Sequence, residues 1–517
     1  MSPKTLILLI GTLLLGGCAG YHSEPALDQP TRVESVASTP LPFSIEPVNR
    51  ENYSHFETNP VKKASESPIS TFSIDVDTGS YSNVRRILSH GQLPPRDAVR
   101  VEEMINYFSY DYPLPKQLDP PFQVTTEMVQ TPWNKDTVLL LIGIKAYDLP
   151  KDKLPPANLV FLVDVSGSMQ TADKLELLKS ALKLLTQQLT AEDKVTLVVY
   201  AGASGLVLEP TSGDQKEKII AALNQLTAGG STNGGEGIKL AYAMARQSLI
   251  QGGINRVILA TDGDFNVGIV EIEMLKDFIE AQRKSGISLT TVGFGAGNYN
   301  DALMEQLADV GNGNYAYIDT LDEAQKVFVD QMSSTLQTVA KDVKVQIEFN
   351  PETVDEYRLI GYENRVLQRE DFSNDQVDAG EMGAGHTVTA LYEMALVGGK
   401  GQRLEPLRYH KKRPTSSHGN ELAFLRLRYK LPDKEDSQLL EQAIERQLLS
   451  SRSSSRLRFA AAVAAFGQQL RGGQYLGDFS YGKILELAQT AQTSDPFRAE
   501  FLNLVKSAQA LSTPNKH

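Results

Sequence analysis

Residues 158–168 read NLVFLVDVSGS, and this stretch contains the pattern that decides the fold. The apolar run Leu159–Val163 is typical of a strand buried on both faces of a parallel sheet. It ends directly on Asp164, Ser166 and Ser168. From Leu175 to Leu189 leucines then recur at spacings of three and four, which indicates one face of a helix. Strand, polar turn and amphipathic helix in this order predict a unit of an open α/β sheet.

The same alternation continues for about 180 residues. Apolar runs predict further strands at 195–200, 257–260, 287–292 and 315–318, and helical spacing predicts helices at 238–250, 271–283, 302–307 and 324–339. Residues 158–341 are therefore expected to form an α/β domain, a doubly wound Rossmann-like parallel sheet with helices on both faces. In such sheets ligands bind beyond the carboxyl ends of the strands.

Oxygen-bearing side chains follow the strand ends of this domain. Asp164 and Asp262 each come at the end of a predicted strand, and Thr232 lies in the Gly-rich loop 229–235. Together with the hydroxyls of Ser166 and Ser168, these side chains offer the oxygen ligands that a hard divalent cation prefers. The sequence therefore predicts a metal site for Mg²⁺, with Mn²⁺ and Ca²⁺ as alternatives.

The pattern Asp-x-Ser-x-Ser, followed by a Thr and then an Asp, resembles the metal-ion-dependent adhesion site (MIDAS) of von Willebrand factor type A domains. The resemblance implies that Ser166, Ser168 and Thr232 coordinate the cation, and that Asp164 and Asp262 bind it directly or through water. It also implies that an open coordination position accepts a carboxylate from a partner protein. No catalytic residue is implied.

The resemblance extends beyond the central domain. Residues 72–114, 361–393 and 459–488, the last reading FAAAVAAFGQQLRGGQYLGDFSYGKILELA, are similar to YfbK-like bacterial lipoproteins. The similarity covers about residues 70–510. It implies an N-terminal segment, a central von Willebrand A domain and a C-terminal domain. The biochemical role of that family is poorly defined, so the resemblance defines the architecture better than the biology.

The flanks of the central domain carry strand patterns on both sides. Val343, Val345, Ile347 and Phe349 alternate with polar residues, which predicts a half-buried strand. Similar runs occur at 124–129, 137–144, 387–392 and 422–429. We therefore expect one β-sandwich built from both flanks, with the central domain inserted in it. The expected parts are an N-terminal flank at 69–157, a β-rich segment at 342–432 and a helical C-terminal region at 433–517.

The N-terminus predicts export and a lipid anchor. Residues 1–17 carry Lys4 and then ten apolar or small residues, which suits a signal peptide and is too short to span a bilayer. Leu15-Gly16-Gly17 precede Cys18 and resemble a bacterial lipobox, which implies that Cys18 is acylated. By resemblance to Gram-negative lipoproteins, Ala19 at the next position, rather than Asp, favours the outer membrane over retention in the inner membrane. The Pro-rich stretch 18–68 is expected to be a flexible linker that lets the body stand off the membrane.

The composition argues against several classes of function. The formal charge is −12 over 517 residues, which disfavours nucleic acid as a partner. A single Cys excludes intrachain disulfides and Cys-based zinc sites. No His lies between residues 91 and 385, so the central domain lacks an imidazole base for hydrolysis.

The leading hypothesis is thus a non-enzymatic, envelope-anchored adhesion or scaffolding protein that binds an acidic residue of an unidentified protein partner through its metal. A metal-dependent envelope hydrolase and a structural lipoprotein whose metal only braces loops stay open as alternatives. The oligomeric state is open as well.

Two other motifs receive structural interpretations. Asp75-Val76-Asp77-Thr78 is similar to an aspartyl-phosphate motif but has Gly79 where that motif needs Thr or Val. We expect a turn capped by carboxylates ahead of a helix at 81–88. His386 lies near Asp378 and Glu381, and we expect a hydrogen-bonded loop residue there.

Overall fold

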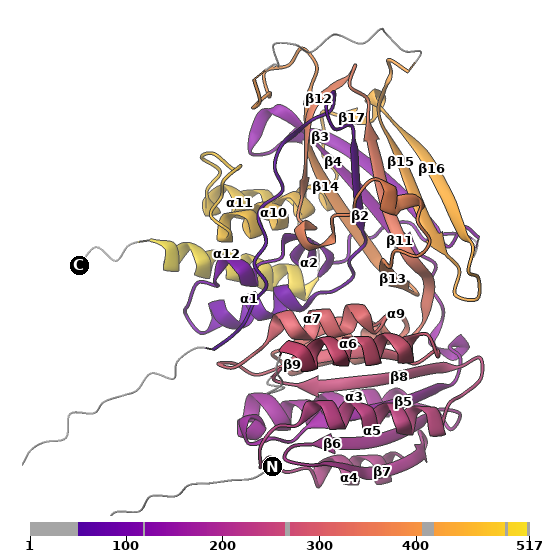
Figure 1. The fold of residues 1–517 in the computed structure, drawn as a ribbon. Helices are drawn as coiled ribbons and strands as arrows, with labels where there is room; N and C mark the ends of the chain where they lie inside the picture. The colour runs from indigo at the N-terminus through magenta and orange to yellow at the C-terminus, as the bar shows by residue number, and fades with distance from the viewer. Residues whose placement is uncertain (1–49, 117–118, 264–268, 406–417, 492–494, 514–517) are drawn as a thin grey trace, which may run out of the picture. The chain divides into compact units, whose positions relative to one another are not determined.

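Three β-sheets organise the chain in the computed structural model, which describes residues 50–116, 119–263, 269–405, 418–491 and 495–513 (Figure 1). One sheet belongs to the central domain, and the other two are built from the flanks. Residues 1–49 lie outside the described residues, so the predicted signal peptide, Cys18 and the start of the linker are not part of this description.

The central sheet has six strands in the order β10-β9-β8-β5-β6-β7. The predicted strands are confirmed as β5 (Ala157–Asp164), β6 (Lys194–Tyr200), β8 (Ile254–Thr261), β9 (Ser288–Phe294) and β10 (Tyr315–Ile318), all parallel. The sheet is nevertheless mixed, because β7 (Ser204–Ser212) pairs antiparallel with β6. Only three residues separate the two strands, so the chain folds back as a hairpin rather than crossing over.

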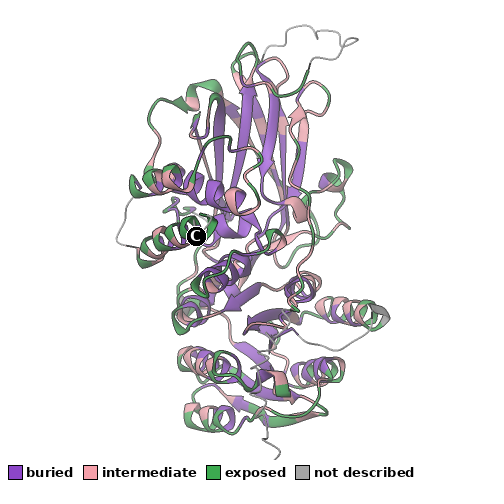
Figure 2. Cartoon of the chain, turned by 90° about the vertical axis from the view of Figure 1, so that its left-hand side faces the viewer, coloured by how far each residue is buried: buried purple, intermediate pink, exposed green. Residues whose placement is uncertain are grey.

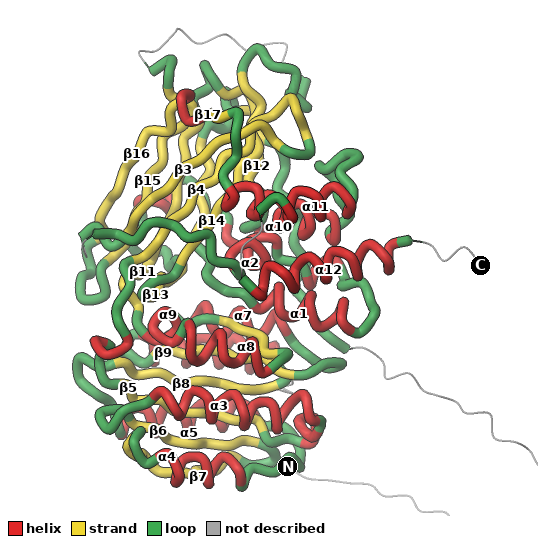
Figure 3. The backbone as a smooth tube through the Cα atoms, turned by 180° about the vertical axis from the view of Figure 1, so that it is seen from behind, coloured by secondary structure: helices red, strands yellow, loops and turns green. Residues whose placement is uncertain are grey.

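Helices cover both faces of this sheet, as the sequence predicted. Leu159, Phe161 and Val163 of β5 pack in one cluster with the helices α3 (Leu177–Gln188), α4 (Lys216–Asn224), α8 (Leu321–Gln325) and α9 (Met332–Leu336). Val160 and Leu162 point to the other face, with α5 (Gly234–Gln247), α6 (Ile269–Arg283) and α7 (Asp301–Val310). The α3 face is toward the viewer in Figure 3, and the α5 face in Figure 1. Alternation along β5 therefore places one half of its apolar side chains in each layer.

The two flanks share one β-sandwich. β4 (Asn134–Ala146), which precedes the central domain, pairs antiparallel with β14 (Thr387–Leu396), which follows it, and Leu141 lies opposite Leu391. The first sheet has the order β1-β12-β14-β4-β3-β17, and the second has β13-β11-β15-β16 with β2 paired to β11. The predicted insertion of the central domain between paired flanks is confirmed by this pairing. The remaining strands are β1 (Lys62–Lys63), β2 (Ile69–Ser73), β3 (Phe122–Thr131), β11 (Thr338–Phe349), β12 (Val354–Ile360), β13 (Gly380–Gly383), β15 (Glu421–Lys430), β16 (Ser437–Glu445) and β17 (Leu449–Ser450).

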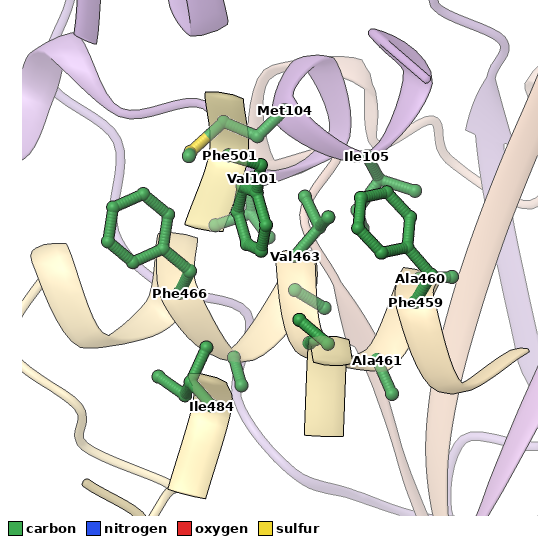
Figure 4. Close-up of a cluster of buried hydrophobic side chains, with 14 of the residues drawn as sticks. Val101, Met104, Ile105, Phe459, Ala460, Ala461, Val463, Phe466, Ile484 and Phe501 are labelled. Carbon is green, nitrogen blue, oxygen red and sulfur yellow. The ribbon is translucent and has the colours of Figure 1, made fainter. Parts of the chain in front are cut away.

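A helical layer covers the outer face of the first sheet. Leu140 and Ile142 of β4 point into the sandwich, whereas Leu139 and Leu141 point to the helices. These helices are α1 (Gly79–Ser89), α2 (Val101–Asn106), α10 (Ser455–Leu470), α11 (Tyr481–Gln489) and α12 (Pro496–Ser512). Residues 459–467 of α10 are all buried, and Figure 4 shows their side chains against α2 and α12 (burial is coloured in Figure 2). Its small alanines let neighbouring helices approach closely on every side.

Two boundaries predicted from the sequence are wrong. Residues 437–445 are not helical but form the strand β16, because pairing with β15 outweighs the helix-like spacing of Leu440 and Ile444. The linker predicted to reach residue 68 ends earlier, since β1 pairs with β12. Moreover, the amide of Arg50 donates to Gly297 O at 2.7 Å. A Pro-rich segment without periodicity can still dock by backbone hydrogen bonds.

Buried ion pairs join the central domain to the flanks. Arg100 before α2 contacts Asp301 and Glu305 of α7. Arg85 of α1 contacts Asp319, just before α8, and Glu323 within it. All these side chains are less than a tenth exposed. Arg365 of the C-terminal flank contacts Asp309. The arginines come from the flanks and these carboxylates come from the central domain, so we name this region the arginine junction.

Candidate metal centre

Asp164 is fixed at the carboxyl end of β5 by hydrogen bonds to both carboxylate oxygens. Oδ1 accepts the amide of Ser166 at 2.8 Å, and Oδ2 accepts the hydroxyls of Thr261 at 2.7 Å and Tyr200 at 3.2 Å. The residue is 0% exposed. Thr261 and Tyr200 stand at the ends of the two neighbouring strands, β8 and β6. Hydrogen bonds from the turn after β5 and from the ends of β6 and β8 thus orient this carboxylate.

The hydroxyls of Ser166 and Ser168 face each other beside this carboxylate. Their Oγ atoms lie 3.0 Å apart, and Ser166 is buried. Two ligands on one edge of a Mg²⁺ octahedron are about 3 Å apart, because Mg–O distances are about 2.1 Å. The separation of the two hydroxyls therefore fits adjacent ligands of one small divalent cation.

The Gly-rich loop lies against the loop of the two serines. Gly167 N–H donates to Gly230 O at 3.0 Å, and Gly229 N–H donates to Val165 O at 2.7 Å. Gly230 has φ +86°, a left-handed conformation that glycine adopts without strain. Thr232 is half-buried two residues further along. Backbone hydrogen bonds thus bring the loop of the third predicted hydroxyl ligand next to the first two.

Asp262 follows β8 and is held by two side chains that the sequence analysis missed. Its Oδ2 accepts Lys174 Nζ and Asn298 Nδ2, both at 3.0 Å. Asp262 is 0% exposed, and Lys174 is buried as well. One signal for Lys174 was present in the sequence, since it lies four residues before Leu178 and so continues the apolar stripe of that helix. Asn298 in the loop before α7 gave no such signal.

The electrostatics of the site favour a cation. Burial raises the pKa of Asp164 to about 6, and the negative charge of Asp262 adds to this rise, while hydrogen bonds from Thr261 and Ser166 oppose it. A divalent cation would lower that pKa. Among the described residues no three His, Cys, Asp or Glu side chains gather to hold a metal. Within the described part of the chain, the side-chain oxygens available to a cation here are therefore those of two carboxylates and of the Ser and Thr hydroxyls.

The other sequence motifs have structural roles. Asp77 accepts the amide of Tyr315, and its neighbour Asp75 pairs with Arg365 at the arginine junction. The helix predicted at 81–88 is α1. His386 accepts the amide of Gly383 through Nδ1, and burial lowers its pKa to about 3, so it stays neutral. No helix among the described residues is long and apolar enough to cross a membrane.

Comparison with known proteins matches the whole described body. Residues 158–339 match the family model of the von Willebrand factor type A domain, residues 47–141 match a model described as von Willebrand factor, and residues 334–511 match the C-terminal model of uncharacterized protein YfbK. Uncharacterized protein YfbK of Escherichia coli (strain K12) is 49% identical over 470 residues, which cover 89% of this chain and 81% of that protein.

More distant similarities have lower sequence identity. Inter-alpha-trypsin inhibitor heavy chain H4 of Homo sapiens is 28% identical over 169 residues, covering 31% of this chain and 18% of that protein. A solved von Willebrand factor type A structure from Catenulispora acidiphila has a TM-score of 0.44 at 16% identity and covers 77% of this chain and 91% of its own. Identity to the Escherichia coli protein over most of both lengths, together with the fold of the central sheet, shows that the chain belongs to the YfbK family and contains a central von Willebrand factor type A domain.

Proposed function

We propose that this chain is a non-enzymatic binding protein that holds one divalent cation, Mg²⁺ by preference, at Asp164, Ser166, Ser168, Thr232 and Asp262. The cation, when bound, supplies a Lewis-acid position for a carboxylate oxygen of a partner protein. The observation that carries the proposal is the pair of hydroxyls 3.0 Å apart beside two buried carboxylates from separate strand ends. The membership of the central domain in an interaction-module family supports it.

Cation binding is tested first, with purified protein lacking residues 1–17. Mn²⁺ is titrated and free Mn²⁺ is measured by electron paramagnetic resonance, with Mg²⁺ as competitor. Asp164→Asn should weaken Mn²⁺ binding at least tenfold. Asp193→Asn is the matched control, because Asp193 is a buried carboxylate that instead accepts the amides of Ala157, at the start of β5, and Thr190, in the loop before β6. Equal Mn²⁺ affinity in the Asp164→Asn protein and the wild type would overturn the site.

Partner binding is tested by affinity capture from envelope extracts of the source bacterium. Captured proteins should be eluted by EDTA and should be absent with the Asp164→Asn protein. Capture that is unchanged by both treatments would contradict a metal-bridged contact. The captured partner can then be screened by changing its Asp and Glu residues, one of which should abolish binding.

We also propose that the chain is anchored in the cell envelope through acylated Cys18. The membrane that we propose is the outer membrane, because Ala19 rather than Asp follows the acylated residue. The basis is the lipobox-like sequence alone. Growth with radiolabelled palmitate should label the wild-type protein and leave Cys18→Ser unlabelled. Fractionation of the membranes then gives the location, and recovery of the wild-type protein in the inner membrane would contradict the outer-membrane assignment.

A further inference from the structure

A lysine ammonium is built into the candidate metal centre. Lys174 Nζ lies 3.0 Å from Asp262 Oδ2 and 2.8 Å from Asn298 Oδ1, and its side chain is 7% exposed. Asn298 in turn donates to the same carboxylate oxygen at 3.0 Å. The three side chains therefore close a triangle of hydrogen bonds in which the ammonium and the carboxylate are held by a common neighbour.

The backbone makes room for this lysine. Gly295 has φ +74°, and a Cβ at that position would lie 2.2 Å from Cε and 2.3 Å from Cγ of Lys174. The aliphatic stem thus lies directly against the glycine that follows β9. Lys174 lies in the helical turn at 172–176, and its side chain extends to the residues that follow β8 and β9. The fold therefore holds its ammonium inside the site.

This ammonium changes the charge balance of the site. The two carboxylates of Asp164 and Asp262 alone would neutralise a divalent cation and leave no electrostatic demand for a further anion. Together with the ammonium of Lys174, these two carboxylates carry a net charge of −1 without metal and +1 with a divalent cation. One incoming carboxylate restores neutrality. In a buried region an unbalanced charge is costly, so the balance favours an anionic ligand over a neutral one.

We propose that Lys174 makes the loaded site select a carboxylate, at the expense of weaker binding of the cation itself. The inference rests on the proposed function and adds to it the residue that sets ligand charge. It predicts that loss of the ammonium changes the cation affinity and the coupling between cation and carboxylate in opposite directions. Removing the ammonium should tighten cation binding, because a like charge is lost, and should weaken the coupling between cation and carboxylate. A residue with only a structural role would weaken both.

The experiment measures Mn²⁺ affinity in sodium chloride and in sodium acetate at the same ionic strength and pH. Acetate serves as the carboxylate probe. If acetate binds the loaded site, it must tighten Mn²⁺ binding by the same factor by which Mn²⁺ tightens acetate binding. Lys174→Met removes the charge and keeps the stem. Lys179→Met is the matched control, because Lys179 is also a buried lysine paired with a carboxylate, Glu176, but lies away from the site.

In the wild type and in Lys179→Met, we expect acetate to tighten Mn²⁺ binding severalfold. In Lys174→Met, we expect Mn²⁺ binding in chloride to be about tenfold tighter and the acetate effect to fall toward one. Acetate coupling of wild-type size in Lys174→Met would overturn the inference and leave the proposed function intact. Absence of Mn²⁺ binding by the wild type would overturn the proposed function itself.

Discussion

The candidate metal centre and the arginine junction both bury carboxylates of the central domain, but they oppose them with different groups. Asp164 faces hydroxyls and a backbone amide, and Asp262 faces one ammonium and one amide side chain. At the junction, by contrast, Asp301 and Asp319 face arginines from the flanks. All four aspartates belong to the central domain, so the two regions differ in the groups that oppose the same kind of side chain.

The difference is the one expected between the proposed ligand site and a structural contact. A guanidinium is permanently charged and planar, so it fixes a carboxylate without leaving a position for anything else. Hydroxyls are neutral and rotate, so they can turn their oxygens toward a cation. A buried carboxylate surrounded by hydroxyls therefore indicates a place for a cation, whereas one opposed by arginine indicates domain attachment.

The largest expected effect is on stability at the arginine junction. Arg100→Met leaves Asp301 and Glu103 buried without their counter-charge, and we expect a loss of about 3–5 kcal/mol in the free energy of unfolding. Urea denaturation measures it. Arg426→Met is the control, because Arg426 is 31% exposed and also contacts two carboxylates, and it should cost less than about 1 kcal/mol. Similar losses of unfolding free energy in both variants would mean that burial does not make the ion pairs of Arg100 more important for stability than those of Arg426.

A second effect depends on pH and concerns a flank carboxylate without an arginine. Burial raises the pKa of Glu102 to about 8, with the charge of Glu363 adding to it. The folded protein therefore keeps this proton up to about pH 8, whereas the unfolded chain releases it near its ordinary value of 4.5. Stability from this group is present at low pH and is lost as pH rises through that window.

Glu102→Gln mimics the protonated form and should remove this loss. The variant should be close to the wild type at pH 5 and exceed it by about 4 kcal/mol at pH 9 in urea denaturation. A wild-type advantage that grows with pH would show instead that Glu102 is ionised and paired in the folded protein.

The smallest expected effect is a gain in stability at the candidate metal centre, opposite in sign to the loss at the arginine junction. In EDTA at pH 8, Asp164→Asn removes a buried charge that no arginine opposes, so we expect the free energy of unfolding to rise by about 1 kcal/mol. Asp301→Asn, the matched change at the junction, should lower it, because it deprives Arg100 of a partner. A loss of stability in the Asp164→Asn protein would remove the contrast between the two regions.

Local sequence patterns were enough to predict the central domain and to name the five candidate ligands. Buried strands, helical spacing and the motif at Asp164 are local patterns, and parallel strands necessarily bring their carboxyl ends to one edge. Strand alternation on both flanks also sufficed to predict that the flanks pair, as β4 and β14 do.

The contacts between distant charges and the pairing of the edge segments could not be predicted from local patterns. Lys174 meets Asp262, and Arg100 meets Asp301, across 88 and 201 residues, and no local pattern encodes which charges meet. The strand at 437–445 and the docked segment from residue 50 likewise depend on the backbone partners that the folded chain provides. The physical reason is the same in each case. Periodicity reports which face of an element is buried, whereas charge pairing and edge-strand pairing depend on which distant segment lies beside it.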